Sequence, residues 1–234
     1  MEEVPPVSEW PTYVYPQVDK LLGLSGGTAK RWINGYVRNG RPYDPIVRPE
    51  PLPTAWVTWG EFLETRLMAN YRDIDEVPVQ HIRRCVNRLR EQTGERHPLT
   101  KLSTFIKADG RELLFASQDP PSDTEPFRFA ERLSDGQLRL LPWVQLYVDS
   151  VVQDEMTDDD ITAIRPDLDF PDIVCVASRR GGRPTVVGRN VLARTVSDLL
   201  VAGETAADVA EWYSITPAQV DQARSYVRAH AAAA

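Results

Sequence analysis

A short stretch near the amino terminus carries hydroxyl, cationic and amide side chains whose types and spacing suit DNA recognition. On a predicted helix that has Ala29, Trp32, Ile33 and Tyr36 on one buried face, the polar side chains point elsewhere. They are Thr28, Lys30, Arg31 and Asn34. A hydroxyl, two cations and an amide suit contacts with phosphates and base edges in a major groove. The candidate DNA-contacting residues are Ser25, Gly27, Thr28, Lys30, Arg31, Asn34, Arg38, Arg41 and Arg48.

Two short helices joined by a tight turn are predicted to position these residues, within residues 13–36. Val18, Leu21 and Leu22 give the first helix an apolar stripe, and the second has an apolar face that begins at Ala29. Gly23 stands at the turn, where glycine tolerates a positive φ. We interpret the stretch as a helix–turn–helix.

The segment after the second helix, residues 37–59, is rich in proline and glycine. It contains the turn signal Asn39-Gly40, and Arg38, Arg41 and Arg48 make it basic. A solvated linker is one interpretation of this composition, because loops frequently carry charge.

Catalytic and metal-binding patterns are not recognisable in the sequence. It has no nucleophile motif, P-loop or glycine-rich dinucleotide loop. His81 and Cys85 are four residues apart, but with only His97 and His230 in addition a full metal-ligand set is missing. We therefore expect no enzyme activity, no metal and no cofactor.

Charge is distributed unevenly along the 234 residues. The net charge is −7, but residues 1–115 carry 16 Lys and Arg against 15 Asp and Glu, whereas the remainder carries 11 against 19. A DNA-binding face in the first half is therefore compatible with the acidic total. No signal segment or membrane-spanning run is apparent, so we expect a cytoplasmic protein. The two distant cysteines argue against a disulfide scaffold.

The remaining pattern predicts a mainly α chain with small β elements. A capping box at Thr58–Glu61 predicts a helix to about Tyr71, and Pro78 fits the first turn of the next. Asp109-Gly110, between apolar runs, predicts a hairpin over residues 105–115. A strand followed by a helix after Pro142 is expected within residues 138–152.

Three short strands are predicted at residues 161–164, 173–177 and 184–187, followed by three helices. Capping-box spacing occurs at residues 195 and 198, 205 and 208, and 216 and 219. We divide the chain into residues 1–116, a DNA-binding domain; 117–126, a linker; and 127–234, a module with a small sheet and a three-helix unit.

The carboxy-terminal part resembles a small bacterial family common in toxin–antitoxin operons. The resemblance rests on a G-R-P strand at Gly182, an A-G-E helix end at Ala202 and a closing P-x-x-V helix at Pro217. The amino-terminal unit is similar to MerR-type helix–turn–helix units. Together they resemble long VapB-type antitoxins, which are paired with PIN-like ribonuclease toxins.

This resemblance implies an antitoxin that neutralises a PIN-like ribonuclease toxin and represses its own operon by binding operator DNA as a homodimer. Residues 1–116 would then be a winged helix–turn–helix, with the wing in residues 37–59. Candidates for toxin binding or dimerisation are the arginines of the second half, Arg179, Arg180, Arg183 and Arg189. These arginines can equally be turn residues, and the acidic residues of 149–172 can instead meet a basic toxin surface.

Two other functions fit the same sequence. One is a MerR-like, ligand-responsive transcription regulator without a toxin partner. The other is a protein-interaction adaptor whose helix–turn–helix units contact no DNA. A DNA-binding protein differs from such an adaptor because its affinity for DNA falls steeply as the salt concentration rises.

Overall fold

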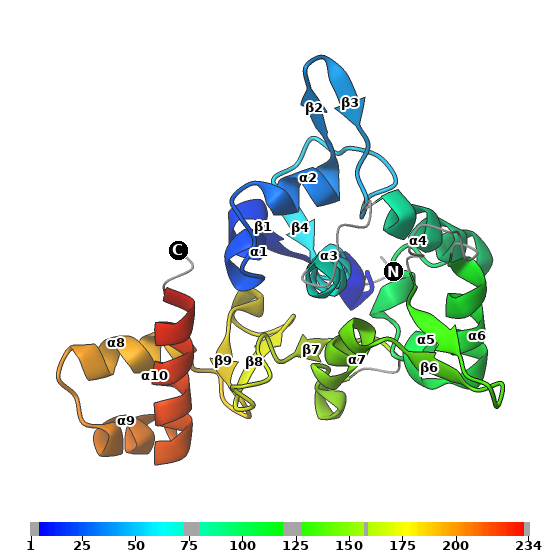
Figure 1. The fold of residues 1–234 in the computed structure, drawn as a ribbon. Helices are drawn as coiled ribbons and strands as arrows, with labels where there is room; N and C mark the ends of the chain where they lie inside the picture. The colour runs from blue at the N-terminus through cyan, green and yellow to red at the C-terminus, as the bar shows by residue number, and fades with distance from the viewer. Residues whose placement is uncertain (1–4, 73–79, 119–127, 157–158, 232–234) are drawn as a thin grey trace. The chain divides into compact units, whose positions relative to one another are not determined.

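The computed structural model describes residues 5–72, 80–118, 128–156 and 159–231. The chain divides into two compact units. Unit 1 comprises Met1–Asp149 with Asp158–Asp160, and unit 2 comprises Ser150–Thr157 with Ile161–Ala234. Helices dominate and every sheet is small and antiparallel, so the predicted mainly α class with small β elements is confirmed (Figure 1).

Unit 1 combines helices with three two-stranded sheets, which pair β1 with β4, β2 with β3, and β5 with β6. Its elements are β1 (Pro11–Val14), α1 (Tyr15–Leu21), α2 (Thr28–Asn34), β2 (Tyr36–Arg38), β3 (Arg41–Tyr43), β4 (Trp56–Thr58), α3 (Trp59–Arg72), α4 (Gln80–Thr93), α5 (Ser103–Ile106), α6 (Ala108–Ser117), β5 (Ala130–Arg132), β6 (Leu138–Leu140) and α7 (Pro142–Asp149).

Helix α3 is the central buried element of unit 1. Its start is fixed by the predicted capping box, in which the Thr58 amide donates to Glu61 Oε2 at 2.9 Å and the Glu61 amide donates to Thr58 Oγ1 at 3.3 Å. The first turn also anchors an aromatic cluster, because Phe62 lies 4.6 Å from Tyr13 of β1, centroid to centroid. Tyr13, Trp59 and Phe62 are all fully buried.

The hairpin predicted over residues 105–115 is wrong, because this stretch forms helices α5 and α6. Gly110 lies inside α6, where a Cβ would come within 2.3 Å of the carbonyl oxygen of Ser103. Glycine is needed here for the close approach of two helices rather than for a turn, a requirement that the local pattern Asp109-Gly110 does not reveal.

The end of unit 1 lies further along the chain than the linker that we expected at 117–126. Ser117 and Gln118 are buried, and residues 119–126 lie outside the described part. Strands β5 and β6 pack on α6, and α7 packs on α3. The strand and helix predicted around Pro142 are present as β6 and α7, and they belong to unit 1.

Unit 2 is a three-stranded sheet followed by three helices. Its elements are β7 (Ala163–Ile164), β8 (Ile173–Val176), β9 (Thr185–Val186), α8 (Ala193–Val201), α9 (Ala206–Tyr213) and α10 (Pro217–Ala231), and the strand order is β7-β8-β9. The three predicted strands and three predicted helices are therefore confirmed. The core joins both parts, because Ile173 and Val186 of the sheet pack with Val196, Val209 and other buried residues of the helices.

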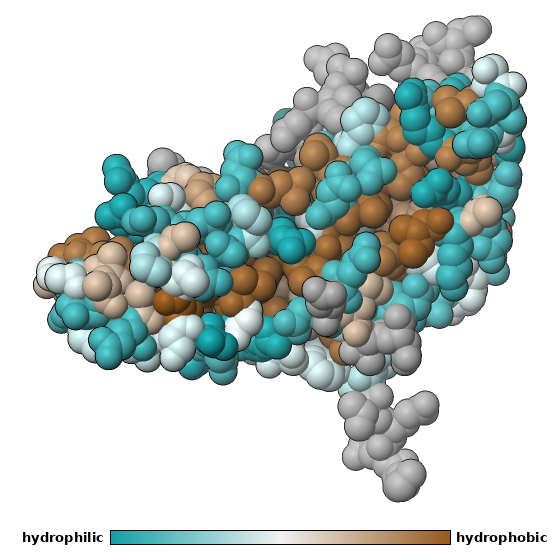
Figure 2. All heavy atoms as spheres, turned by 90° about the horizontal axis from the view of Figure 1, so that it is seen from below, coloured by the Kyte–Doolittle hydropathy of each residue, from teal (hydrophilic) through white to brown (hydrophobic). Residues whose placement is uncertain are grey.

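Local signals set most helix ends in unit 2. Thr205 caps α9 by accepting from the Asp208 amide at 3.2 Å, and Thr216 exchanges the equivalent bonds with Gln219 at the start of α10. The cap predicted at Thr195 is wrong, because α8 already begins at Ala193. Figure 2 shows hydrophobic side chains exposed over the helices of this unit, at the left of the view.

Candidate functional site

The turn between α1 and α2 is held by one buried carboxylate. Asp19 of α1, which is 6% exposed, accepts from the Gly27 amide through Oδ2 and from the Ala29 amide through Oδ1, both at 2.7 Å. These amides belong to the amino end of α2, where backbone donors have no partner within the helix. Asp19 therefore fixes α2 against α1, and Gly23 and Gly27 supply the positive φ angles of the turn.

The outer side of α2 presents two cations. Lys30 and Arg31 are exposed, and Arg31 Nη2 donates to Thr28 Oγ1 at 2.7 Å. Thr28 itself is buried, and its hydroxyl also lies 2.9 Å from that of Ser25. Of the predicted DNA-contacting residues in this stretch, the structure leaves Ser25, Gly27, Lys30 and Arg31 exposed and gives Thr28 a local structural role.

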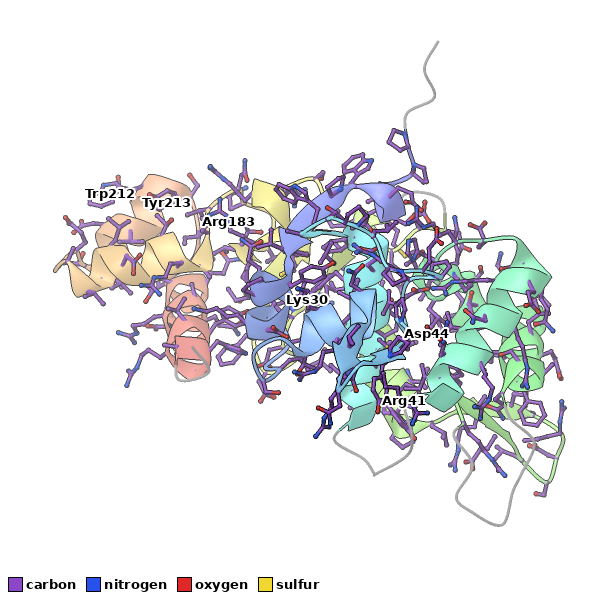
Figure 3. The ribbon with its side chains drawn as sticks, turned by 90° about the horizontal axis from the view of Figure 1, so that it is seen from above. Lys30, Arg41, Asp44, Arg183, Trp212 and Tyr213 are labelled. Carbon is purple, nitrogen blue, oxygen red and sulfur yellow. The ribbon has the colours of Figure 1, made fainter. Side chains whose placement is uncertain are left out.

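The predicted turn at Asn39-Gly40 closes the hairpin formed by β2 and β3. Both turn residues have positive φ, 52° and 75°, and Arg38 pairs with Arg41 across the strands. Tyr36 and Tyr43 stack at 4.7 Å below the tip. Figure 3 shows Arg41 on this hairpin and Lys30 on neighbouring α2. The hairpin thus carries two exposed arginines next to the exposed cations of α2.

Arg48, which we predicted as a DNA contact, lies in the core instead. Its side chain is 2% exposed and makes a bidentate pair with Glu61, with Nε–Oε1 at 2.6 Å and Nη2–Oε2 at 2.9 Å. It also donates to the Tyr15 hydroxyl, to Asn34 Oδ1 and to the carbonyl of Trp56. All five N–H donors of the guanidinium are thereby used. Although burial lowers the pKa of Arg48, its bonding and charge pairing with Glu61 raise that pKa above the ordinary value.

Asn34 also differs from its predicted role. Its Oδ1 accepts from Arg48 Nη1 and from the Leu52 amide, both at 2.7 Å. The half-buried side chain therefore ties the end of α2 to the chain that follows the hairpin. Arg48 and Asn34 therefore help to position the exposed cations Lys30 and Arg31, and are not themselves exposed for contact with DNA.

The four arginines of unit 2 that we predicted for toxin binding or dimerisation separate into two kinds. Arg179 is neutralised by a bidentate pair with Glu155, at 2.9 and 3.0 Å. Arg180, Arg183 and Arg189 are exposed and bond through Nε to oxygens of neighbouring loops. The structure brings these three to the β8–β9 loop and the turn after β9, whereas Arg179 is committed to its carboxylate partner.

Several residues that shape the candidate sites were missed by sequence reasoning. Asp19 contacts amides eight and ten residues away, and Glu61 pairs with Arg48 thirteen residues away, so no local spacing marks either role. Trp212, which is 56% exposed on α9, was also missed. The sequence signal that could have identified Trp212 is an aromatic residue at an outward-facing position of a predicted helix.

Two further findings concern the described residues only. Within those ranges no group of three or more His, Cys, Asp or Glu is placed to hold a metal ion. The side chain of His81 falls outside the description. Nor does any helix in the described part combine the length and apolarity needed to cross a bilayer.

The sheet and helices of unit 2 define the class of module to which this part of the chain is similar. Residues 173–227, from β8 into α10, match the family model described as "Protein of unknown function (DUF433)". The whole chain belongs to the family of a Mycobacterium tuberculosis protein named "Uncharacterized protein Rv2308", with 38% identity over 218 residues, 92% of this chain and 90% of the relative.

Two more distant similarities also extend over nearly the whole chain. A Mycobacterium tuberculosis protein named "Putative antitoxin VapB45" is 25% identical over 235 residues, 94% of this chain and 95% of that protein. The crystal structure of Rv2018 from the same bacterium has a TM-score of 0.71 at 24% identity, covering 92% of this chain and 98% of that one. The latter similarity establishes a shared fold.

Proposed function

We propose that this protein is the antitoxin of a toxin–antitoxin pair, and that it binds both a toxin and the operator DNA of its own operon. The relative named as an antitoxin, with coverage of nearly the whole chain, supports the first half of the proposal. The matched toxin is a PIN-like ribonuclease, and the antitoxin acts in the cytoplasm without a cofactor and without catalysis of its own.

One observation carries the DNA-binding half: four cations of unit 1 are exposed and make no ion pair with any carboxylate in the described ranges. They are Lys30 and Arg31 on α2, and Arg38 and Arg41 on the β2–β3 hairpin. Arg83, by contrast, pairs with Asp44 at 2.7 Å. Unpaired cations on adjacent elements create the positive potential that attracts phosphates.

In this proposal the two elements have different tasks. Helix α2 is held rigidly at its amino end by Asp19 and at its carboxyl end by Asn34, so Lys30 and Arg31 present fixed backbone positions to a groove. The hairpin then lies over the adjacent sugar-phosphate backbone with Arg38 and Arg41. One short helix reads only a few base pairs, so the protein acts as a homodimer on two half-sites.

The experiment is co-purification with the product of the adjacent gene, followed by a mobility shift on the shared upstream DNA. Lys30→Ala combined with Arg31→Ala is expected to abolish the shift and to leave the protein complex intact. Arg224→Ala, which removes an exposed arginine of α10, is the matched control. Arg38→Ala with Arg41→Ala is expected to lower the salt dependence by roughly two phosphate contacts.

The outcomes separate the functions considered. A complex that retards the DNA supports the proposal. DNA binding without a protein partner instead favours the ligand-responsive regulator. Loss of both activities in the Lys30 and Arg31 double variant, with the fold intact by circular dichroism, contradicts separate surfaces for DNA and toxin.

A further inference from the structure

Three arginines and two aromatic residues of unit 2 form a second surface, here called the Arg–Trp surface. It consists of Arg180 and Arg183 in the β8–β9 loop, Arg189 in the turn after β9, and Trp212 and Tyr213 at the end of α9. Figure 3 shows Arg183, Tyr213 and Trp212 in unit 2. Tryptophan, tyrosine and arginine are the residues that contribute most to the free energy of binding at protein interfaces.

Hydrogen bonds join the three arginines to one another's loops and to the residue that follows α9. Arg189 Nε donates to the Ser214 carbonyl, the residue that follows Tyr213, at 2.8 Å. Arg183 Nε donates to the Arg180 carbonyl at 2.9 Å, and Arg180 Nε donates to the Asn190 carbonyl at 3.0 Å. The loop arginines, the turn after β9 and the end of α9 are therefore neighbours through direct bonds.

The same bonds preorganise the guanidinium groups. Each arginine is anchored through Nε, and apart from Arg189 Nη1, which contacts the Gly188 carbonyl at 3.2 Å, the terminal nitrogens have no hydrogen-bond partner among the described residues. A guanidinium held in this way loses less conformational entropy when it binds a carboxylate through its terminal nitrogens.

The backbone at Arg180 has a conformation that arginine rarely adopts. Arg180 has φ of 49°, and Gly181 and Gly182 follow with φ of 61° and 68°. A left-handed conformation is unfavourable for arginine and costs glycine nothing. Arginine at this position therefore strains a loop that a third glycine would relax, and such strain is characteristic of binding sites.

Charge identifies the kind of ligand. Arg180, Arg183 and Arg189 form no ion pair with any described carboxylate, in contrast to Arg179, whose partner is Glu155. Unit 2, in which they lie, carries 8 Lys and Arg against 10 Asp and Glu and is nearly balanced in charge. Three guanidinium groups held in fixed positions can each bind a discrete carboxylate.

We propose that the Arg–Trp surface docks an acidic segment of the protein partner, with Trp212 as the apolar anchor. This inference rests on the proposed function for the existence of that partner. Exposed Glu211, beside Trp212, disfavours a phosphate backbone at the same place.

The test is calorimetry of the full chain against the purified product of the adjacent gene, at low and high salt. Arg180→Gly is expected to weaken the complex about tenfold while the melting temperature changes little, because relief of the loop strain offsets the loss of the exposed Nε bonds to Asn190. Trp212→Ala is expected to weaken it at least about tenfold. Arg224→Ala and Val201→Ala, which change an exposed arginine and an exposed apolar residue of the same unit, are the controls.

Each result bears on the inference in a defined way. If the natural sequence forms no complex, the proposed function fails, and the partner of this surface fails with it. If it forms the complex and the Arg180 and Trp212 variants bind equally well, only the Arg–Trp surface is refuted. Loss of DNA retardation with unchanged partner affinity assigns the surface to nucleic acid and overturns the inference.

Discussion

Arg48→Met tests whether Arg48 is a buried structural residue or a DNA contact. The substitution leaves Glu61, which is fully buried, with only the Thr58 amide at 2.9 Å as a donor to its carboxylate. Removing one partner of a buried ion pair costs roughly 3–5 kcal/mol. In a protein of this size each kcal/mol lowers the melting temperature by about 2–4 °C, so a decrease of roughly 6–20 °C is expected.

The assay is thermal and urea unfolding followed by tryptophan fluorescence. Five of the six tryptophans lie in unit 1, and the sixth is Trp212 in unit 2. In a Trp212→Phe background the fluorescence therefore reports unit 1 alone. The matched control is Arg139→Met, because Arg139 pairs with Glu131 at the surface with 66% of its side chain exposed. An exposed pair contributes at most about 1 kcal/mol.

A second variant separates the lost pairing from lost packing. Arg48→Met combined with Glu61→Gln removes the unpaired charge while keeping an acceptor for the Thr58 amide. We expect this double variant to recover much of the lost stability, as a positive coupling in a double-mutant cycle. The reasoning is refuted if Arg48→Met melts within about 2 °C of the natural sequence and yet loses its affinity for DNA.

Three further predictions concern particular contacts in unit 1. Asp19→Ala removes two hydrogen bonds at the amino end of α2 and is expected to lower the free energy of unfolding in urea by about 1–3 kcal/mol. An unchanged urea midpoint would contradict the role of Asp19 in fixing α2 against α1. Gly110→Ala is expected to cost about 1–3 kcal/mol because its Cβ would lie 2.3 Å from the Ser103 carbonyl, whereas Gly26→Ala, with open space around it, serves as the near-neutral control. Burial raises the pKa of Tyr147 above its ordinary value of 10.0, so unfolding releases a proton above that pH and stability falls as pH rises further. Tyr147→Phe should flatten this alkaline dependence, and an unaltered slope would assign it to other groups.

Features whose causes lie within a few residues could be predicted from the amino-acid sequence. Asn39-Gly40 closes a hairpin and Thr205 caps a helix, because each depends on φ angles or bonds that span at most three residues. The same local reasoning placed Lys30 and Arg31 on the outer side of α2, where the structure has them.

Features that depend on partners distant in the chain could be seen only in the folded structure. Arg48 reads as one more cation of a basic loop, yet it bonds Tyr15, thirty-three residues earlier, and Glu61, thirteen residues later. Gly110 reads as a turn, although packing between two helices requires it. In each case the residue type was informative, but its partner was not adjacent in sequence. Burial then changed an expected surface role into a structural one, because a side chain in the core must satisfy every donor there.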